Sequence, residues 1–280
     1  PTAFQEPGGG EVQLLKTKEY LQSHCGIEAK LFDQWTDSFS GFDILHTFGS
    51  VKDCLNMILA ARQKGVKIAL STICWYSWKS AWCTYSGWKD RSVSVMRQFA
   101  KTFFPYIPSK RKSMMDHSDL LFPNSRTEAD QLVRYFCIPR DKIFVVPNGV
   151  DPIFASAKPD AFVDKYGLEN FVLCVGRIEP RKNQLNMIRA LKGSKIPLVI
   201  IGDYIYQYQE YYESCRLEAG DNVYFLGVMP HDSPILISAY AACNTFLLPS
   251  WLETPGLAAL EAALAGAKVV ITNQGAAPEY

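Results

Sequence analysis

The chain has 280 residues, of which 48% are hydrophobic, and its 29 basic and 28 acidic residues leave a formal net charge of +1. This length suits two globular domains better than one, and the near-neutral balance gives no overall attraction to nucleic acid. The charges are uneven along the chain, because residues 1–150 hold 19 Lys and Arg against 14 Asp and Glu. The first half is therefore the one expected to meet an anionic partner or surface.

Eight cysteines are scattered along the sequence, without a C-x-x-C pair or a spacing typical of metal sites. Most of them lie inside apolar segments, which indicates buried free thiols in a reducing compartment. No apolar run in the sequence reaches the length that a membrane-spanning helix needs. We therefore expect a cytoplasmic protein.

Helical and strand-like segments alternate along the first half. The spacing of apolar residues predicts helices over residues 11–24, 52–63, 92–104 and 126–136. Short apolar segments predict strands over residues 29–32, 43–46, 67–71, 120–123 and 143–146. Residues 147–170 hold three prolines among mixed polar residues and are typical of a connection between domains.

The second half has the clearer pattern. Segments rich in β-branched and aromatic residues predict strands over residues 171–175, 198–201, 223–226, 245–248 and 269–271, and a helix is predicted over 184–191. Strands that alternate with helices indicate right-handed βαβ units and a parallel sheet. The sequence thus predicts two α/β domains, residues 1–150 and 151–280, with a cleft between them.

Two cations follow the strand predicted over residues 171–175. In open parallel sheets, ligands bind at the carboxyl ends of strands. Arg177 and Lys182 lie there, in a loop that leads into a helix, where backbone N–H groups favour an anion. A guanidinium fork and a compact ammonium together suit a diphosphate. A solvated loop with incidental charges is the alternative explanation of the same residues.

Two carboxylates follow the strand predicted over residues 245–248. Glu253 and Glu261 lie eight positions apart, and Pro255 and Gly256 precede an Ala- and Leu-rich helix whose first turn offers a second anion site. If the segment is helical throughout, the carboxylates are about 12 Å apart at roughly 1.5 Å per residue. Each could then accept hydrogen bonds from sugar hydroxyls at one end of a nucleotide sugar. The alternative is that Glu261 only caps or pairs on a helix surface.

These motifs together resemble the group 1 (GT4) glycosyltransferases. The ordered matches cover nearly the whole chain: residues 8–12, 123–125, 146–151, 175–182 and 223–227, and the Glu253-x7-Glu261 pair. The resemblance implies the GT-B fold, an α/β architecture of two Rossmann-like, doubly wound parallel-sheet domains that face a cleft. Residues 1–150 would form the acceptor side, and residues 151–280 would bind the nucleotide sugar. The implied enzyme is a retaining glycosyltransferase of polysaccharide biosynthesis, which moves a hexose to a glycan or lipid-linked acceptor.

The resemblance also implies roles for single side chains. Arg177 and Lys182 would hold the donor phosphates and stabilise the leaving nucleoside diphosphate. Glu253 would bind the donor hexose, and Glu261 would bind the ribose hydroxyls. Arg177, Lys182 and Glu253 are therefore the catalytic candidates.

Backbone groups would complete the donor site in such an enzyme. Amides near Gly256 and Leu257 would add phosphate contacts. Gly9 and Gly10 would let a loop of the first domain come close to the donor, since a side chain there would obstruct it. The family further implies front-face departure of the phosphate, in which the leaving group helps to deprotonate the incoming hydroxyl.

Two missing patterns narrow the chemistry. The sequence contains no Asp-x-Asp, which disfavours the metal-dependent GT-A enzymes, and we expect neither a metal nor a cofactor. Residues 8–13 fail the G-x-G-x-x-G fingerprint because Gln13 takes the place of its last glycine, which disfavours hydride transfer.

The histidines supply no evident general base. Many relatives carry a histidine after the strand that corresponds to residues 67–71, but residues 72–78 contain none. His46 ends a predicted strand, where a packed core histidine is favoured over one that faces the cleft, and His117 is also expected to be structural. We assign no general base.

Residues 75–112 combine aromatic and basic side chains. They hold four of the six tryptophans, and eight basic residues against the single acid Asp90. This mixture suits the interface of an anionic membrane or a lipid-phosphate acceptor. An ordinary acceptor-side wall with a solvated basic loop explains it equally well.

Three other functions remain open. A nucleotide-sugar epimerase of the GT-B fold would use the donor without an acceptor, and a sugar phosphorylase would need inorganic phosphate. A non-catalytic subunit would only bind the sugar nucleotide. Arg177, Lys182, Glu253 and Glu261 are all present, which disfavours the non-catalytic subunit.

We expect the chain to be a part of a longer protein, truncated at both ends. In a doubly wound domain, a loop such as residues 8–10 follows the central first strand, and too few residues precede it to form that strand. Relatives continue beyond the strand predicted over residues 269–271 with another strand and with helices that pack on the first domain. We therefore expect weak catalysis or low stability from this chain alone.

Overall fold

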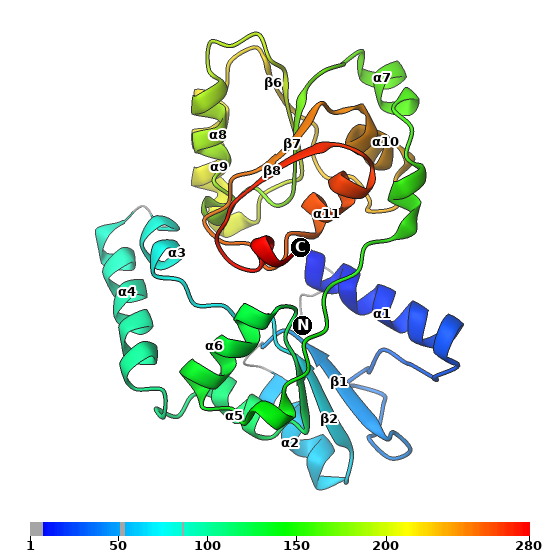
Figure 1. Ribbon diagram of the computed structural model, residues 1–280, viewed down its shortest axis with the longest axis vertical. Coiled ribbons are helices and arrows are strands. Elements are labelled where there is room, and N and C mark those ends of the chain that lie inside the picture. Colours follow the sequence, from blue (N-terminus) through cyan, green and yellow to red (C-terminus); the bar gives the residue numbers. More distant parts are fainter. Residues whose placement is uncertain (1–7, 51–53, 86) are drawn as a thin grey trace. The chain divides into compact units, whose positions relative to one another are not determined.

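The computed structural model describes residues 8–50, 54–85 and 87–280 (Figure 1). The chain forms two compact units: Pro1–Tyr76 with Val95–Asn148 and Glu279, and Ser77–Ser94 with Gly149–Pro278 and Tyr280. Each unit has its own parallel sheet. Residues 77–94, which we expected in the first domain, group with the second unit, and the domain boundary at residue 150 stays a prediction.

The first unit is built on a three-stranded parallel sheet with the strand order β1-β2-β3. These strands are β1 (Ile44–Phe48), β2 (Lys67–Ser71) and β3 (Leu120–Phe122). The central strand β2 is buried along all but its first residue, so its apolar residues form a continuous run rather than an alternation.

Helix α1 (Gly9–Cys25) precedes β1. The helices that follow the three strands are α2 (Leu55–Gln63), α3 (Trp78–Cys83), α4 (Trp88–Phe103), α5 (Lys110–Asp116) and α6 (Arg126–Phe136), of which α3 and the start of α4 group with the second unit. The core of the first unit joins β2 to buried residues of α2, α5 and α6, including Ile58, Met114 and Leu132. Ser125 precedes α6 as its N-cap, and its hydroxyl accepts a hydrogen bond from the Glu128 amide (3.1 Å).

The second unit has a five-stranded parallel sheet with the strand order β6-β5-β4-β7-β8. The strands are β4 (Val172–Val175), β5 (Leu198–Ile201), β6 (Val223–Phe225), β7 (Thr245–Leu248) and β8 (Lys268–Ile271). The chain starts in the centre at β4, runs outward through β5 and β6, and returns to β7 on the other side. The strand order therefore reverses between β4 and β7, and the carboxyl end of that pair is the usual ligand site of such sheets.

Helices cover both faces of this sheet. Helices α8 (Gln184–Leu191) and α9 (Gln209–Glu218) pack on one face, in a core that includes Ile188 and Cys215 (Figure 1). Helices α7 (Asp160–Tyr166), α10 (Pro234–Ala242) and α11 (Leu257–Leu264) form the other core, around Phe162, Tyr240 and Phe246. Coverage of both faces confirms the predicted doubly wound α/β architecture for this unit.

Some predicted elements are wrong. Residues 29–32 form no strand, and their apolar side chains stay outside the core of the sheet: Leu31 is exposed, and the ring of Phe32 stacks on Phe39 (4.5 Å between centroids). Residues 143–146 make only an isolated bridge, between Leu121 and Ile143. Helix α1 starts at Gly9 and α4 starts at Trp88, both earlier than predicted, and residues 52–53 of the second predicted helix lie outside the described residues.

The cysteines are all free thiols, as expected, but only half of them are buried. Cys74, Cys174, Cys215 and Cys243 are buried, whereas the others are partly or fully exposed. Within the described part of the chain, no helix is both long and apolar enough to cross a membrane.

Candidate functional site

The loops after β4 and β7 meet at one ion pair. Lys182 ends the short 3-10 helix Pro180–Lys182 after β4, and Glu253 lies in the loop after β7. The Nζ atom of Lys182 lies 2.7 Å from Oε1 of Glu253. Because β4 and β7 are paired parallel strands, this contact lies at their common carboxyl edge, where the strand order reverses. The predicted cation loop and the predicted carboxylate loop are thus brought together.

Arg181 adds a second cation to this cluster. Its guanidinium lies 2.6 Å from Glu179 Oε1 and 3.7 Å from Glu253 Oε1, and it donates to the carbonyl oxygen of Leu252 (2.9 Å). Arg181 therefore ties the two loops together through both backbone and side chain. Our sequence analysis missed this residue, although its place beside Lys182 was a usable signal.

Glu253 is a buried carboxylate that stays ionised. Only 3% of the residue is exposed, and burial by itself raises the pKa of the carboxyl group. The charges of Lys182 and Arg181, with hydrogen bonds from Lys182 and the Ser250 hydroxyl, outweigh burial and hold the pKa below its ordinary value. Near pH 7, Glu253 is thus an acceptor only, which suits it to bind hydroxyl groups.

The backbone at Glu253 leaves no room for a side chain at Gly275, which lies beside it. Gly275 lies beside Glu253 in a parallel bridge, and a Cβ atom on Gly275 would be 2.0 Å from the Glu253 carbonyl oxygen. The amide of Ala276 donates to that same oxygen (2.9 Å). The loop after β7 is therefore held against the segment that follows β8.

Helix α11 begins beyond Glu253, at Leu257. Gly256 precedes it in a left-handed conformation (φ 85°), and the Thr254–Pro255 peptide bond is cis. Glu253 and Glu261 are therefore not on one continuous helix, and the separation of about 12 Å expected from a helical rise does not apply. The helix predicted to follow Pro255 and Gly256 is confirmed.

Glu261 is held by two side chains from other elements. Its Oε2 accepts a hydrogen bond from the hydroxyl of Tyr240 in α10 (2.7 Å), and its Oε1 lies 2.9 Å from Nε2 of His231. Tyr240 is fully buried, which raises its pKa well above the ordinary value and keeps the hydroxyl protonated. Glu261 itself is only 6% exposed, so it is not a surface carboxylate that pairs in solvent.

Arg177, Gly9 and Gly10 are the remaining predicted site residues. Arg177 is half-buried in the loop after β4, and its carbonyl oxygen accepts a hydrogen bond from Gln184 (2.9 Å). Gly9 and Gly10 belong to the first unit and form the first turn of α1, so the prediction that they lie in a loop is wrong. Gly8 caps that helix, and its amide donates to Glu11 (2.8 Å).

The two histidines expected to be structural are packed. His46 Nε2 lies 2.9 Å from the Ser71 hydroxyl, and burial lowers the pKa of His46 to about 4. Its ring also contacts Phe48 and Phe122. The Nδ1 of His117 lies 2.7 Å from the carbonyl oxygen of Ser113. Neither geometry assigns a general base.

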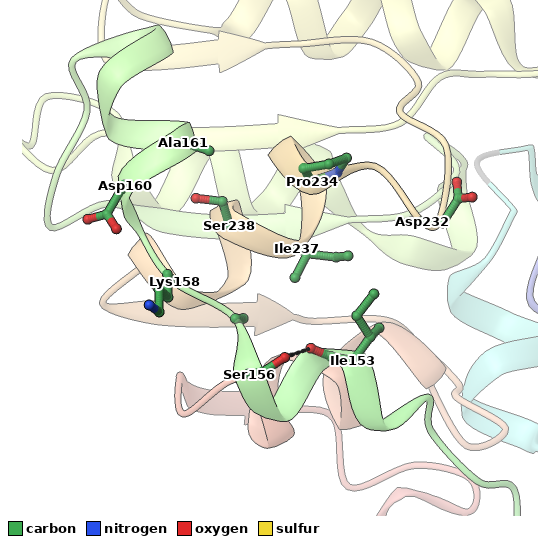
Figure 2. A pocket seen from close by; sticks show the side chains of 10 residues that line it. Ile153, Ser156, Lys158, Asp160, Ala161, Asp232, Pro234, Ile237 and Ser238 are labelled. Carbon is green, nitrogen blue, oxygen red and sulfur yellow. Dashed lines mark hydrogen bonds between the residues drawn. The ribbon is translucent and has the colours of Figure 1, made fainter.

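A shallow hollow lies elsewhere in the second unit, between residues 153–161 and α10 (Figure 2). Ile153, Ala161 and Ile237 give it an apolar lining, and Lys158, Asp160 and Asp232 lie at its charged positions. None of the predicted site residues lines it. We therefore do not place the donor there.

Sequence profiles of two glycosyltransferase families match most of the chain. The profile of glycosyl transferases group 1 matches residues 159–280, and that of Glycosyltransferase Family 4 matches residues 27–154. The chain belongs to the GT4-type group 1 glycosyltransferases. This confirms the resemblance on which the residue roles were based.

Two curated relatives illustrate the similarity. D-inositol 3-phosphate glycosyltransferase of Mycolicibacterium smegmatis is 32% identical over 179 residues, which cover 60% of this chain and 40% of that protein. O-antigen chain mannosyltransferase B of Escherichia coli is 28% identical over 192 residues, 62% of this chain and 48% of that protein. This glycosyltransferase chain thus spans about half the length of the curated relatives it matches.

Solved structures confirm the GT-B fold. Anabaena HepE in complex with UDP and glucose aligns with 98% of this chain and 80% of its own, at a TM-score of 0.67 and 18% identity. Sucrose-phosphate synthase from Thermosynechococcus elongatus aligns with 84% of this chain and 57% of its own, at a TM-score of 0.62 and 21% identity. These identities support the fold and not a shared substrate.

Proposed function

We propose that this glycosyltransferase chain carries the donor site of a retaining hexosyltransferase that works without a divalent metal. The observation that carries the proposal is the cluster of Lys182, Arg181 and buried Glu253 at the carboxyl ends of β4 and β7. Cations held at that edge can neutralise a diphosphate, and an ionised carboxylate beside them can bind the sugar hydroxyls. A nucleotide sugar presents both groups within one molecule.

The proposed reaction divides the work between phosphate and sugar. Arg177 and Lys182 stabilise the charge that develops on the leaving diphosphate as the bond from the anomeric carbon to the phosphate oxygen breaks. The acceptor hydroxyl forms its new bond on the same face and gives its proton to the departing phosphate oxygen. Glu253 orients the hexose through its hydroxyls, which keeps the anomeric carbon beside the acceptor. This route needs no protein general base.

The ribose site is proposed at Glu261, with phosphate contacts from the amides of Gly256 and Leu257. Gly256 adopts a conformation that a side chain would strain, and a Cβ there would lie 3.3 Å from side chains of Ile271 and Leu248. Gly256 therefore has no side chain that could cover the backbone amides of Gly256 and Leu257. Backbone amides at the start of a helix attract phosphate. Gly9 and Gly10 begin α1, whose amides would serve a phosphate in the same way.

Product analysis tests the proposal against its alternatives. The protein is incubated with UDP-, GDP-, ADP- and dTDP-hexoses, with and without a mixture of glycan and lipid-linked acceptors. A retaining transferase forms a product of unchanged anomeric configuration only when an acceptor is present. An epimerised donor without acceptor, or a sugar phosphate formed only with inorganic phosphate, would support the epimerase or the phosphorylase instead.

We propose an anionic membrane as a further partner, on the cytoplasmic side, through α4 and the turn after it. Met96, Phe99 and Phe103 recur along one face of α4 and are 64%, 49% and 60% exposed, and Phe104 and Tyr106 continue the apolar surface. Arg97 and Lys110 are exposed nearby in the sequence. Exposed aromatic side chains flanked by basic ones suit the headgroup region of an anionic bilayer.

A further inference from the structure

A half-buried arginine lies at the carboxyl edge of the sheet in the first unit. Arg111, in α5, donates from Nε to the carbonyl oxygen of Ser50 (3.3 Å) and from Nη1 to the hydroxyl of Tyr76 (3.4 Å). Ser50 follows β1 and Tyr76 follows β2, and these two strands are parallel neighbours. The guanidinium therefore lies beside the ends of two adjacent strands, where open α/β sheets bind their ligands.

The hydrogen-bond partners of Arg111, a backbone carbonyl oxygen and a tyrosine hydroxyl, carry no charge near pH 7. Among the described residues, no carboxylate oxygen lies within 4.0 Å of its guanidinium. The nearby Cys74 and Tyr76 side chains would act on it by charge only if they were ionised. Burial raises the pKa of Cys74 to about 11 and raises that of Tyr76 too, so both are uncharged near pH 7. A partly desolvated cation among neutral groups is costly unless an anion joins it.

Lys101 is a second cation near Arg111 and Tyr76. Its Nζ atom lies 4.4 Å from the centre of the Phe136 ring and 3.4 Å from the Ser109 hydroxyl. The Phe136 ring packs against Tyr76, whose hydroxyl contacts Arg111. Burial lowers the pKa of Lys101, and the nearby positive charges of Lys112 and Arg111 lower it further. Lys101 and Arg111 are thus close enough to repel each other.

The loop that carries Tyr76 is held rigidly by α6. Buried Glu128 accepts hydrogen bonds from the Thr72 hydroxyl and from the Cys74 amide (2.6 Å). Gln131 bonds both backbone groups of Tyr76, its Oε1 to the amide (2.8 Å) and its Nε2 to the carbonyl oxygen (3.0 Å). The Tyr76 hydroxyl and the arginine that contacts it are therefore fixed before any ligand arrives, which is a property of built binding sites.

We propose that Arg111 and Lys101 bind an anionic group of the acceptor, a phosphate monoester or phosphodiester, with the Tyr76 hydroxyl as a third donor. The guanidinium retains N–H donors beyond those used for Ser50 and Tyr76, so it can hold two oxygens of one phosphate. An anion between the two cations removes their repulsion. This inference rests on the proposed glycosyl transfer and names the class of acceptor for it.

The test measures phosphate binding while the donor site is filled. The protein is first saturated with whichever of UDP, GDP, ADP or dTDP stabilises it most against thermal unfolding. It is then titrated with glycerol 3-phosphate, or with glycerol as the uncharged control, at constant ionic strength. We expect saturable stabilisation by the phosphate ester and none by glycerol. If the phosphate ester gives no stabilisation, and phosphatidylglycerol vesicles show no Arg111-dependent binding, the proposal is overturned.

Matched variants locate the site. Arg111→Gln should weaken glycerol 3-phosphate binding at least about tenfold, as the loss of a charge-assisted hydrogen bond implies. Arg111→Lys keeps the charge but loses the paired N–H donors of the guanidinium, so its affinity for glycerol 3-phosphate should lie between those of the wild type and Arg111→Gln. Lys101→Gln should weaken binding severalfold. Lys64→Gln removes one charge from an exposed position elsewhere in the first unit and should change nothing. Equal losses in Lys64→Gln and Arg111→Gln would leave only general charge attraction and overturn the site.

Nucleoside diphosphate binding and vesicle binding show whether a negative result concerns this phosphate site or the proposed function. Arg111→Gln should keep the nucleoside diphosphate affinity of the wild type, because Arg177, Lys182 and Glu253 are in the second unit. A wild-type circular-dichroism spectrum shows that the variant is folded. If glycerol 3-phosphate binds, a soluble phosphate ester suffices, whereas Arg111-dependent binding of phosphatidylglycerol vesicles alone assigns the site to a lipid headgroup. If no nucleoside diphosphate stabilises the wild type, the proposed function fails, independently of this site.

Discussion

The ammonium of Lys182 lies 2.7 Å from the carboxylate of Glu253, although 71 positions separate them in the sequence. The two side chains come from the loops after β4 and β7, the strands between which the order of the sheet reverses. One contact therefore unites the cation and the carboxylate that the donor site needs. Because the pair is buried, the unfolding free energy of variants at these two positions tests whether the contact forms.

Removal of Lys182 should cost more stability than removal of an exposed lysine. Lys182→Met leaves buried Glu253 with Arg181 at 3.7 Å as its nearest cation, so we expect unfolding free energy to fall by about 3 kcal/mol. Lys192→Met is the control, because Lys192 pairs with Glu218 in an exposed bridge that solvent screens, so its loss should lower stability far less. Urea unfolding of both variants measures the difference. Equal losses would show that the Lys182–Glu253 pair is not buried in solution.

Acid should destabilise the protein partly through Glu253. Its pKa is lowered in the folded state, so its contribution to stability is complete above the unfolded value of about 4.3 and is lost as pH falls below it. The slope of unfolding free energy against pH below about pH 5 should therefore be smaller in Glu253→Gln than in wild type. Glu213→Gln, at an exposed position of α9, is the matched control and should keep the wild-type slope. A wild-type slope in Glu253→Gln would contradict the ionised carboxylate.

Glu261 should bind the ribose 2′-hydroxyl and so make the protein prefer ribonucleotides. The wild type should prefer UDP to 2′-deoxy-UDP at least about tenfold, and Glu261→Gln should lose most of that preference. His231→Ala frees one carboxylate oxygen of Glu261 and should lower the same ratio, whereas His231→Asn, which keeps an N–H donor, should restore part of it. Competitive displacement of a fluorescent nucleotide gives all ratios. An unchanged ratio in Glu261→Gln would place the ribose elsewhere.

The apolar face of α4 should bind anionic vesicles. Phe99 and Phe103 are exposed and lie together, with ring centres 4.4 Å apart. Phe99→Ser with Phe103→Ser should abolish most co-sedimentation with phosphatidylglycerol vesicles at low salt, because burial of each ring contributes roughly 1.5–3 kcal/mol. Tyr206→Ser, which removes an exposed aromatic residue of the second unit, should not matter. If the wild type sediments equally with neutral vesicles, the face has another role.

Parts of the fold with a strong local pattern were predicted residue by residue. Strands β2, β5 and β7 and helices α6 and α8 have the predicted bounds. The apolar residues of the two helices recur with the helical period, and the strands are short apolar runs rich in β-branched and aromatic residues. Residues 143–146 were harder, since Phe144 and Val146 do donate to carbonyl oxygens of Leu121 and Pro123 but form no regular ladder. A sequence pattern cannot tell such an irregular edge from a strand.

In the candidate site too, residues placed by a neighbouring element were predictable, and residues brought in from distant elements were not. The residues after β4 and β7 could be predicted, because their place follows from the strands that precede them. The partners of Glu261 could not, since His231 and Tyr240 are 30 and 21 positions away and reach it only through helix packing. The glycines at the start of α1 were misplaced because Gly8 caps the helix one turn earlier than its apolar pattern begins.

Calorimetric titration with a nucleoside diphosphate in the presence of EDTA tests the central claim most directly. The account predicts that the wild type binds the best of UDP, GDP, ADP and dTDP without metal, and that Arg177→Ala weakens this binding at least about tenfold, since a charged contact to phosphate contributes about 1.5–3 kcal/mol. Arg189→Ala, on the exposed side of α8 where Arg189 pairs with Glu218, should bind like the wild type. Unchanged affinity in Arg177→Ala, or binding that appears only with Mg²⁺ or Mn²⁺, would contradict the proposed donor site.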